Sequence, residues 1–245
     1  MRSASFFFMP FPEDMLVEGV DVVYKTKDLF DLSHTLAADY LLDFAYPWEA
    51  LAGLPEHIEA LGKSLDPAFY EEVQPWVWVS KSALVAPSAH LGSPCIIGPE
   101  TEVRHGAFVR GSVLVGEGCV VGNSVELKNV ILFDKVQVAH FNYAGDSILG
   151  YKAHLGAGAI TSNVKADKSP VVVRYGAEEY PTGLRKLGAM VGDWAEIGCN
   201  SVLNPGAVIG RRATVYPLSC VRITVPENHI CKTGGVIVPR REGGF

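Results

Sequence analysis

Aliphatic residues recur at every sixth position along the middle of the chain, in two runs separated by an interruption. They are Val79, Val85, Leu91, Ile97, Val103, Val109, Val115, Val121 and Leu127, then Val191, Ile197, Leu203, Ile209, Val215 and Val221. Neither the 3.6-residue period of an α-helix nor the two-residue period of a strand produces this spacing. A stacked solenoid does, because each unit buries its apolar residue only against the copies above and below it.

A small residue follows most of the aliphatic positions by four, for example Ala83 after Val79 and Ala195 after Val191. Three such hexads make one triangular coil, and coils stack at about the 4.8 Å spacing of hydrogen-bonded strands. We therefore predict an all-β fold, a parallel β-helix whose aliphatic side chains point inward. Any chemistry then belongs to the residues that face outward.

The limits of the repeat divide the chain into three segments. Residues 1–78 lack the six-residue period and carry helical spacing, so we expect a small N-terminal helical cap over the exposed end of the solenoid. Residues 79–225 form the β-helix, with an excursion at 161–186 whose Pro and Gly turns predict a protruding hairpin or loop. Residues 226–245 carry no repeat and are expected to form a tail.

Counting units places particular side chains on particular faces. Two units have five residues and keep the order of faces; they are Leu127–Ile131 and Ala144–Ile148. Units that start at Val103, Val121 and Val138 then share one face, and units that start at Leu127, Ala144 and Thr161 share the next. The count predicts that Glu126 lies directly beside Tyr143 of the following coil. It also predicts that Arg104 and His140 lie at or beside one corner.

Composition excludes several classes of partner. A formal net charge of -6 argues against nucleic acid, which favours clustered Lys and Arg. No apolar run is long enough to cross a bilayer, and Phe6–Phe8 are followed by Pro and acidic residues, unlike a signal peptide. The five cysteines are an odd number without a CxxC motif, as expected for small apolar fillers in a reducing cytoplasm.

The hexads resemble those of the left-handed β-helix acyltransferases, and three segments make the resemblance more specific. They read Gly122-Asn-Ser-Val-Glu-Leu-Lys128, Ala139-His-Phe-Asn-Tyr-Ala-Gly-Asp146 and Gly156-Ala-Gly-Ala-Ile-Thr-Ser-Asn163. This series is similar to the C-terminal acetyltransferase domain of bifunctional glucosamine-1-phosphate acetyltransferase/N-acetylglucosamine-1-phosphate uridyltransferase, and to the β-helix tail of sugar-phosphate nucleotidyltransferases. The close match covers roughly residues 97–163. It implies a left-handed β-helix, acetyl-CoA as a co-substrate, no tightly bound cofactor, and a homotrimer with CoA in a groove between neighbouring solenoids.

The resemblance also implies a role for each matching residue. His140 would be the general base for the sugar amine, Glu126 would orient it, and Asn163 would position the acetyl group or the amine. Substrate would be held by Arg104, Lys128, Tyr143 and His154, and acetyl-CoA by Ala157, Gly158, Cys199 and Pro217. The chemistry agrees, since an amine attacks a thioester only when unprotonated and a phosphate needs fixed cations. Backbone N–H groups at 156–158 are candidates for binding the oxyanion.

The chain departs from the family pattern at three points. His154 stands where the family has an Asn, so the sugar or its phosphate can differ. A lysine that the family places shortly after the position of Asn163 has no aligned partner, and Lys165, Lys168 or Arg174 could substitute for it. The 78 residues before the repeat are too few for a uridyltransferase domain and contain no Gly-rich phosphate loop.

We therefore expect a cytoplasmic, acetyl-CoA-dependent N-acetyltransferase that acts on an amino-sugar phosphate, with no metal and no nucleic-acid or membrane partner. The alternative is a non-catalytic trimeric or regulatory β-helix module. A metal hydrolyase like the γ-class carbonic anhydrases is a third reading, but its two His ligands five residues apart have no equivalent. The histidines considered for it are His90, His105, His140 and His154.

Overall fold

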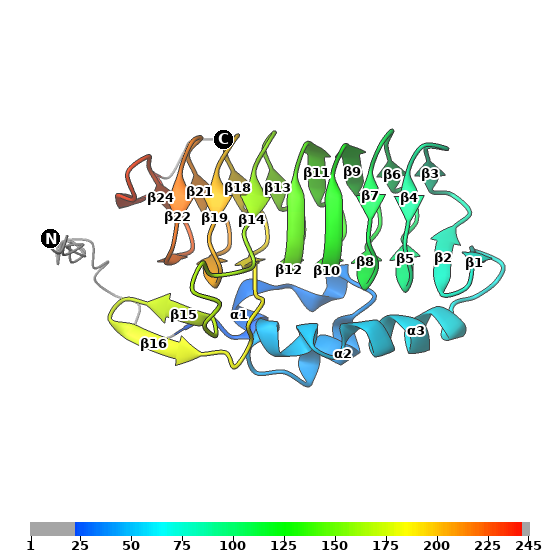
Figure 1. Ribbon diagram of the computed structural model, residues 1–245, viewed down its shortest axis with the longest axis horizontal. Helices are drawn as coiled ribbons and strands as arrows, with labels where there is room; N and C mark the ends of the chain where they lie inside the picture. Colours follow the sequence, from blue (N-terminus) through cyan, green and yellow to red (C-terminus); the bar gives the residue numbers. More distant parts are fainter. Residues whose placement is uncertain (1–22, 242–245) are drawn as a thin grey trace, which may run out of the picture.

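Three ladders of parallel strands wind around one apolar core in the computed structural model, which describes residues 23–241 (Figure 1). Face 1 contains β3 (Leu84–Val85), β6 (Glu102–Val103), β9 (Val120–Asn123), β11 (Gln137–His140), β13 (His154–Leu155), β18 (Glu196–Ile197), β21 (Thr214–Val215) and β24 (His229–Cys231). Face 2 contains β4 (His90–Leu91), β7 (Phe108–Val109), the first halves of β10 (Glu126–Leu132) and β12 (Tyr143–Leu149), β14 (Ile160–Thr161), β19 (Val202–Leu203) and β22 (Cys220–Val221). Face 3 contains β2 (Val77–Ser80), β5 (Cys95–Ile97), β8 (Val113–Val115), the second halves of β10 and β12, β17 (Ala189–Val191), β20 (Ala207–Ile209) and β23 (Thr224–Val225).

The aliphatic position of the hexads forms the core. Val85 pairs with Val103, and Val103 pairs with Val121, so equivalent residues of successive coils stand one above the other. Val103 and Val121 are buried, and burying one such side chain contributes at most about 1.5–3 kcal/mol. The predicted left-handed parallel β-helix is confirmed.

The two five-residue units are also confirmed. Leu132 pairs with Val115 and with Leu149, which restores the face 3 register after each short unit. Each short unit turns the corner between faces 2 and 3 with one residue in the left-handed backbone region, Asn129 (φ 49°) or Asp146 (φ 48°). Strands β10 and β12 therefore run on through this 2–3 corner without a break, as Figure 1 shows.

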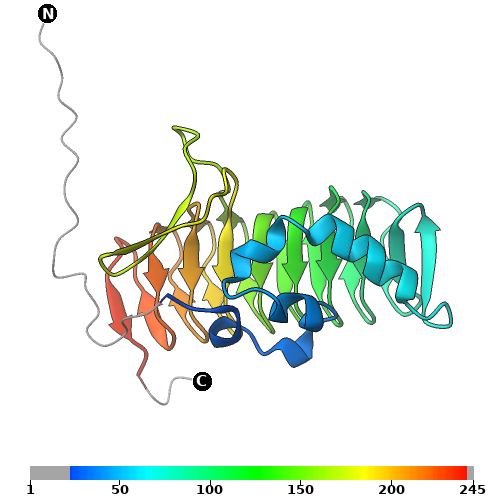
Figure 2. The same cartoon turned by 90° about the horizontal axis from the view of Figure 1, so that it is seen from below.

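The N-terminal segment is helical, but it lies along the side of the solenoid and not over its end (Figure 2). Its elements are α1 (Thr26–Leu29), η2 (Leu32–His34), α2 (Ala38–Leu42), η3 (Pro47–Leu51) and α3 (Leu54–Ser64). Helix α3 contacts β5 and β8, and η3 contacts β12, all on face 3.

Face 3 receives the helices because its outward side chains are apolar. In this ladder the outward residues pair in the order Trp78, Ile96, Leu114, Ile131, Ile148, Met190 and Val208. Each of them is buried. Since adjacent strand residues point to opposite sides, face 3 carries one apolar column toward the core and a second toward the helices. The helical cover thus buries a hydrophobic face that would otherwise be exposed.

Antiparallel strands close both ends of the solenoid. Strand β1 (Tyr70–Gln74) pairs with β2 at the N-terminal end of face 3. At the other end β24 extends face 1, with Cys231 buried beside Val215, and β25 (Ile237–Pro239) folds back on it. The solenoid therefore continues beyond Val225. An added antiparallel strand covers the hydrogen-bonding groups of an edge that would otherwise pair with another chain.

The excursion after β14 is a hairpin of β15 (Val172–Tyr175) and β16 (Glu178–Pro181). Its base is closed where the N–H of Leu187 donates to the carbonyl of Asn163 at 3.0 Å. Strand β15 contacts β20 and β23, and Val171 and Val173 are fully buried. The hairpin therefore packs against face 3 and adds to its cover.

Two further features bear on the sequence predictions. All five cysteines are free thiols, and burial raises the pKa values of Cys95 and Cys119. Between residues 23 and 241 no helix combines the length and the apolar character that crossing a membrane requires. Phe6–Phe8 lie outside the described residues.

Candidate functional site

A column of turn residues runs along the 1–2 corner, where the chain passes from face 1 to face 2, and His140 belongs to it. Each turn donates a backbone hydrogen bond to the coil before it. The donors and acceptors are Phe141 N–H to Asn123 at 3.0 Å, Gly158 N–H to His140 at 3.0 Å, Asn200 N–H to Ala157 at 2.8 Å and Leu218 N–H to Cys199 at 3.0 Å. The structure thus brings the general-base candidate and the four acetyl-CoA candidates into one line along the solenoid.

The turn that presents His140 is held by Asn142. The buried side chain of Asn142 accepts the N–H of His140 at 3.1 Å and donates to the carbonyls of Gly156 and Ala159 at 2.8 and 3.0 Å. The imidazole itself is exposed, and no residue between 23 and 241 forms a hydrogen bond with it. Its backbone is fixed while its ring nitrogens stay available to a ligand.

Face 2 carries a group of polar side chains next to this corner. As predicted, Glu126 pairs directly with Tyr143 of the next coil. The carboxylate of Glu126, however, accepts a hydrogen bond from the guanidinium of Arg110 at 2.7 Å. Because β7 and β10 are in register, Arg110 stands one coil before Lys128 in the same outward column. Two cations therefore follow one another along face 2.

Asp146 is the centre of the polar group at the 2–3 corner. Its carboxylate is 3% exposed and accepts from Lys128 Nζ at 2.7 Å, Asn129 Nδ2 at 2.8 Å and Asn163 Nδ2 at 2.5 Å. Three donors therefore converge on this one buried carboxylate. It fixes the directions of Lys128 and Asn163, both of which are site candidates.

Tyr143 lies between Glu126 and this group. Its hydroxyl accepts a hydrogen bond from Asn163 Nδ2 at 3.1 Å. Burial raises the pKa of Tyr143, and the nearby carboxylates of Asp146 and Glu126 raise it further. The phenol is therefore protonated at neutral pH and keeps its own O–H proton for a ligand.

Arg104 and His154 lie away from the polar group of face 2. Arg104 is on face 1, where its guanidinium bonds to Glu102 at 2.8 Å. His154 is also on face 1, where its Nδ1 lies 2.8 Å from Glu196. The other substrate candidates, Lys128 and Tyr143, share face 2.

Arg110, Asp146 and Asn142 are missing from the residues selected from the sequence. Arg110 had a signal, because it precedes Lys128 by one full coil of three hexads. Asp146 and Asn142 lie inside the quoted segment 139–146, but their contacts depend on the next coil and on the 2–3 corner. A pattern of residue types does not reveal such contacts.

The backbone at 156–158 offers one free donor. The N–H of Gly156 donates to Ile197 at 2.7 Å, and the N–H of Gly158 donates to His140. The N–H of Ala157 has no acceptor within residues 23–241. Of the three, Ala157 is the one able to bind an oxyanion without breaking a bond of the solenoid.

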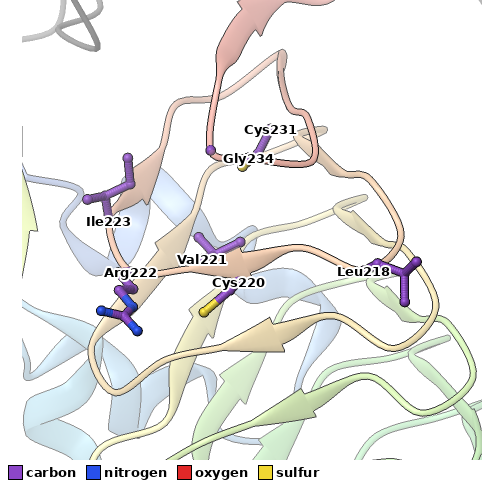
Figure 3. A pocket seen from close by; sticks show the side chains of 8 residues that line it. Leu218, Cys220, Val221, Arg222, Ile223, Cys231 and Gly234 are labelled. Carbon is purple, nitrogen blue, oxygen red and sulfur yellow. The ribbon is translucent and has the colours of Figure 1, made fainter. Parts of the chain in front are cut away.

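A pocket of about 410 Å³ lies beyond the last turn of the 1–2 column (Figure 3). It is lined by Leu218, Cys220, Val221, Arg222, Ile223, Cys231, Gly234 and Gly235. Leu218 belongs both to the column and to the pocket. In the described part of the chain, His, Cys, Asp and Glu side chains do not gather in threes around a possible metal position.

Comparison with protein families finds one matching model, the GMPPB C-terminal domain, over residues 91–173. That span contains face 2 from Leu91 of β4 to β14 and all of the polar group described above.

Among curated proteins, the bifunctional protein GlmU of Methanococcus maripaludis is 29% identical over 201 residues, covering 81% of this chain and 49% of that protein. The bifunctional sugar-1-phosphate nucleotidylyltransferase/acetyltransferase of Sulfurisphaera tokodaii is 34% identical over 94 residues, covering 38% and 23%. The chain thus spans half or less of the length of these relatives.

Two solved structures are more distantly similar. A putative acetyltransferase of Bacillus cereus aligns with a TM-score of 0.38 and 17% identity, covering 67% of this chain and 78% of that one. The acetyltransferase domain of PglB from Neisseria gonorrhoeae aligns with a TM-score of 0.31 and 15% identity, covering 66% and 57%. At this level of similarity the two structures do not indicate a substrate or a mechanism for this chain, and both have to be argued from its own residues. The family resemblance read from the sequence is confirmed by the curated relatives and the family model: the chain is a hexapeptide-repeat β-helix similar to bifunctional GlmU proteins and to the GMPPB C-terminal domain.

Proposed function

We propose that this protein is an acetyl-CoA-dependent N-acetyltransferase that acts on an amino-sugar phosphate, with His140 as general base. The observation that carries the proposal is the position of His140, which stands in line with Ala157, Cys199 and Pro217 at the corner where face 2, the face that carries the cations, begins. The names of the curated relatives, which join sugar-1-phosphate nucleotidylyltransferase and acetyltransferase activities, support the same reaction class.

In this mechanism the neutral amine of the sugar attacks the thioester carbon, and the imidazole of His140 takes one proton from the nitrogen as the N–C bond forms. The tetrahedral intermediate then collapses and the C–S bond of acetyl-CoA breaks. The proton on His140 then passes to the departing thiolate. General base catalysis of this kind contributes about 10²–10⁴ in rate. The N–H of Ala157 would bind the oxyanion of the tetrahedral intermediate.

Arg110 and Lys128 would hold the phosphate of the sugar. They follow one another on face 2, and each already bonds to a carboxylate, Glu126 or Asp146. A phosphate between them would therefore meet cations whose positions are fixed before binding. The phenol of Tyr143 would donate to a sugar oxygen. We assign the phosphate to Arg110 and not to Arg104, because Arg104 lies on face 1 beside Glu102.

Acetyl-CoA would lie along the 1–2 corner, with its thioester at His140 and its nucleotide end toward the pocket in Figure 3. From the coil of His140 to that of Pro217 the column crosses three coil steps, about 14 Å at 4.8 Å per step. This suits a pantetheine arm. One solenoid alone would cover a single side of this arm. We therefore propose a homotrimer in which a second solenoid covers the other side.

The test is CoA release measured with purified protein, acetyl-CoA and glucosamine-1-phosphate. The proposal predicts turnover that disappears without the amine and is lost in His140→Ala. Protein that binds no acetyl-CoA and releases no thiol with any amino-sugar phosphate contradicts it.

A non-catalytic β-helix module is the second candidate function. It is favoured by one observation, that Glu126 bonds to Arg110 and leaves the imidazole of His140 without an orienting carboxylate in the described structure. A well-formed trimer that binds a sugar phosphate but not acetyl-CoA would support this reading.

A further inference from the structure

A second cluster of cationic and aromatic side chains lies at the 3–1 corner, where the chain passes from face 3 to face 1. Its turn residues are Lys135, Lys152, Trp194 and Arg212, with φ values of 61°, 55°, 61° and 56°. Glycine or asparagine occupies this left-handed region at lower cost than long or bulky residues do. The chain instead places three cations and an indole on consecutive turns, about 4.8 Å apart.

Three of these four residues, Lys135, Lys152 and Trp194, border a hollow of about 480 Å³ on face 1. The lining includes Lys135, Gln137, Lys152, His154, Trp194 and Glu196. This volume lies within the usual range for small-molecule sites. Because the 3–1 corner lies across the core from face 2, the hollow is separate within one chain from the polar group around Asp146.

The indole of Trp194 is exposed and held in a fixed orientation. Its side chain is 43% exposed, and the ring of Tyr151 meets it edge-on at 5.4 Å and 90°. Tyr151 is itself stacked on His34 at 3.6 Å and 8°. The backbone N–H of Trp194 donates to the backbone carbonyl of Tyr151 at 2.8 Å. An aromatic ring with this support offers a stacking surface without having to be ordered on binding.

Lys152 and Lys135 both border the hollow, and Lys135 interacts electrostatically with the carboxylate of its neighbour Asp134. Lys152 Nζ lies 4.0 Å from the centre of the Trp194 ring, and Lys135 stands on the previous turn. Within residues 23–241 neither lysine bonds to a carboxylate. Glu196, the carboxylate in the lining, bonds instead to His154 Nδ1 at 2.8 Å. The hollow therefore combines two available cations with one exposed indole.

We propose that this hollow binds a nucleoside phosphate, with the base stacked on Trp194 and the phosphate between Lys135 and Lys152. Every nucleobase has a π-face, so stacking on an aromatic side chain tolerates different bases, whereas the cations require the phosphate. The shared chemistry fits a free nucleotide, a nucleotide-linked sugar or the nucleotide part of CoA. The binding site does not depend on acetyl transfer at the 1–2 corner.

Isothermal titration calorimetry of the full chain tests the site, with UMP, AMP and adenosine 3′,5′-diphosphate as probes and without acetyl-CoA or amine. We expect saturable binding to the wild type, weakened at least tenfold by Trp194→Ala and by the double change Lys135→Ala/Lys152→Ala. Trp194→Phe, which keeps a stacking ring, should stay within about threefold. Trp76→Ala is the matched control, because Trp76 is a second exposed indole with a lysine, Lys63, at 4.5 Å.

Three results would overturn the proposal: no binding of any of the three nucleotides, unchanged binding in Trp194→Ala, or inorganic phosphate binding as tightly as UMP. If all three nucleotides bind, the ligand is a free or sugar-linked nucleotide. If adenosine 3′,5′-diphosphate alone binds and CoA displaces it, the ligand is CoA, and the placement of its nucleotide end at the pocket in Figure 3 is wrong. Loss of acetyl transfer in His140→Ala leaves all of these binding results unchanged, so failure of the catalytic proposal is distinguishable.

Discussion

The guanidinium of Arg110 donates to the carboxylate of Glu126 at 2.7 Å, across one coil of face 2. Because of this contact we propose that Glu126 orients Arg110, whereas the family resemblance implied that it orients His140. It also places Arg110 in the same outward column as Lys128.

We predict that Arg110→Ala raises KM for the sugar phosphate at least tenfold and changes kcat less. Charge-assisted hydrogen bonds to phosphate are stronger than neutral ones, so losing this donor weakens substrate binding. Steady-state kinetics check this. Arg104→Ala is the matched control, because Arg104 bonds to Glu102 on face 1, and a larger effect there would contradict our assignment.

His140→Ala should lower kcat by about 10²–10⁴ with little change in thermal stability. The side chain is exposed, and the turn is held by the backbone and by Asn142. His105→Ala serves as control, since His105 lies at the same corner and bonds to Ser88. Equal turnover in His140→Ala and the wild type would remove His140 from the mechanism.

Asp146→Ala should lower both stability and substrate affinity. It removes the common acceptor of Lys128, Asn129 and Asn163, and unmade hydrogen bonds of buried groups cost about 1–3 kcal/mol. Urea unfolding measures the stability. Asp167→Ala, in the exposed part of the excursion, should leave the stability nearly unchanged. If Asp146→Ala left the unfolding free energy unchanged, the cluster around Asp146 would not form.

Two glycines should respond differently to alanine. A Cβ at Gly122 would overlap the backbone carbonyl of Ala139, which cannot move without shifting a coil. A Cβ at Gly145 would overlap the phenol of Tyr143, which can rotate away. We expect Gly122→Ala to cost about 1–3 kcal/mol of stability, and Gly145→Ala to raise KM with a smaller loss. Thermal unfolding and kinetics on both variants separate the effects, and the reverse pattern would contradict the packing described.

Asp193 provides a test of pH dependence. Burial raises the pKa of this carboxyl above its ordinary value of 3.8. The contribution of Asp193 to stability is therefore complete below pH 3.8 and is lost as the pH rises through the pKa of the folded state. The difference in unfolding free energy between wild type and Asp193→Asn should therefore fall from pH 3.5 to 7. Asp193→Asn should also be less stable throughout by about 1–3 kcal/mol, because one amide oxygen cannot accept from both Asp31 and Tyr151.

Asp31→Asn is the control with the opposite sign. Hydrogen bonds from Ser33 lower the pKa of Asp31, so its contribution is present above 3.8 and lost as the pH falls. The wild-type advantage over Asp31→Asn should therefore grow with pH. If the wild-type advantage in unfolding free energy changed with pH in the same direction for both variants, the assigned pKa directions would be contradicted.

The position of the helices shows where sequence reasoning stopped short. The expectation was a cap over the end of the solenoid, yet the helices lie along face 3. The signal was present, because face 3 units carry two consecutive aliphatic residues, such as Ile96-Ile97 and Leu114-Val115. A second apolar column pointing outward requires a cover along the whole face.

Residue spacing alone determined the solenoid, the two short units and the pairing of Glu126 with Tyr143. These follow because each coil repeats the hydrogen-bond register of the one before it, so counting along the chain predicts neighbours across coils. Only the tertiary structure decided which outward side chains bond to one another. Arg110 takes Glu126, and Asp146 takes Lys128 and Asn163, since the directions and lengths of these side chains and the tight 2–3 corner select among several residues that the count places nearby.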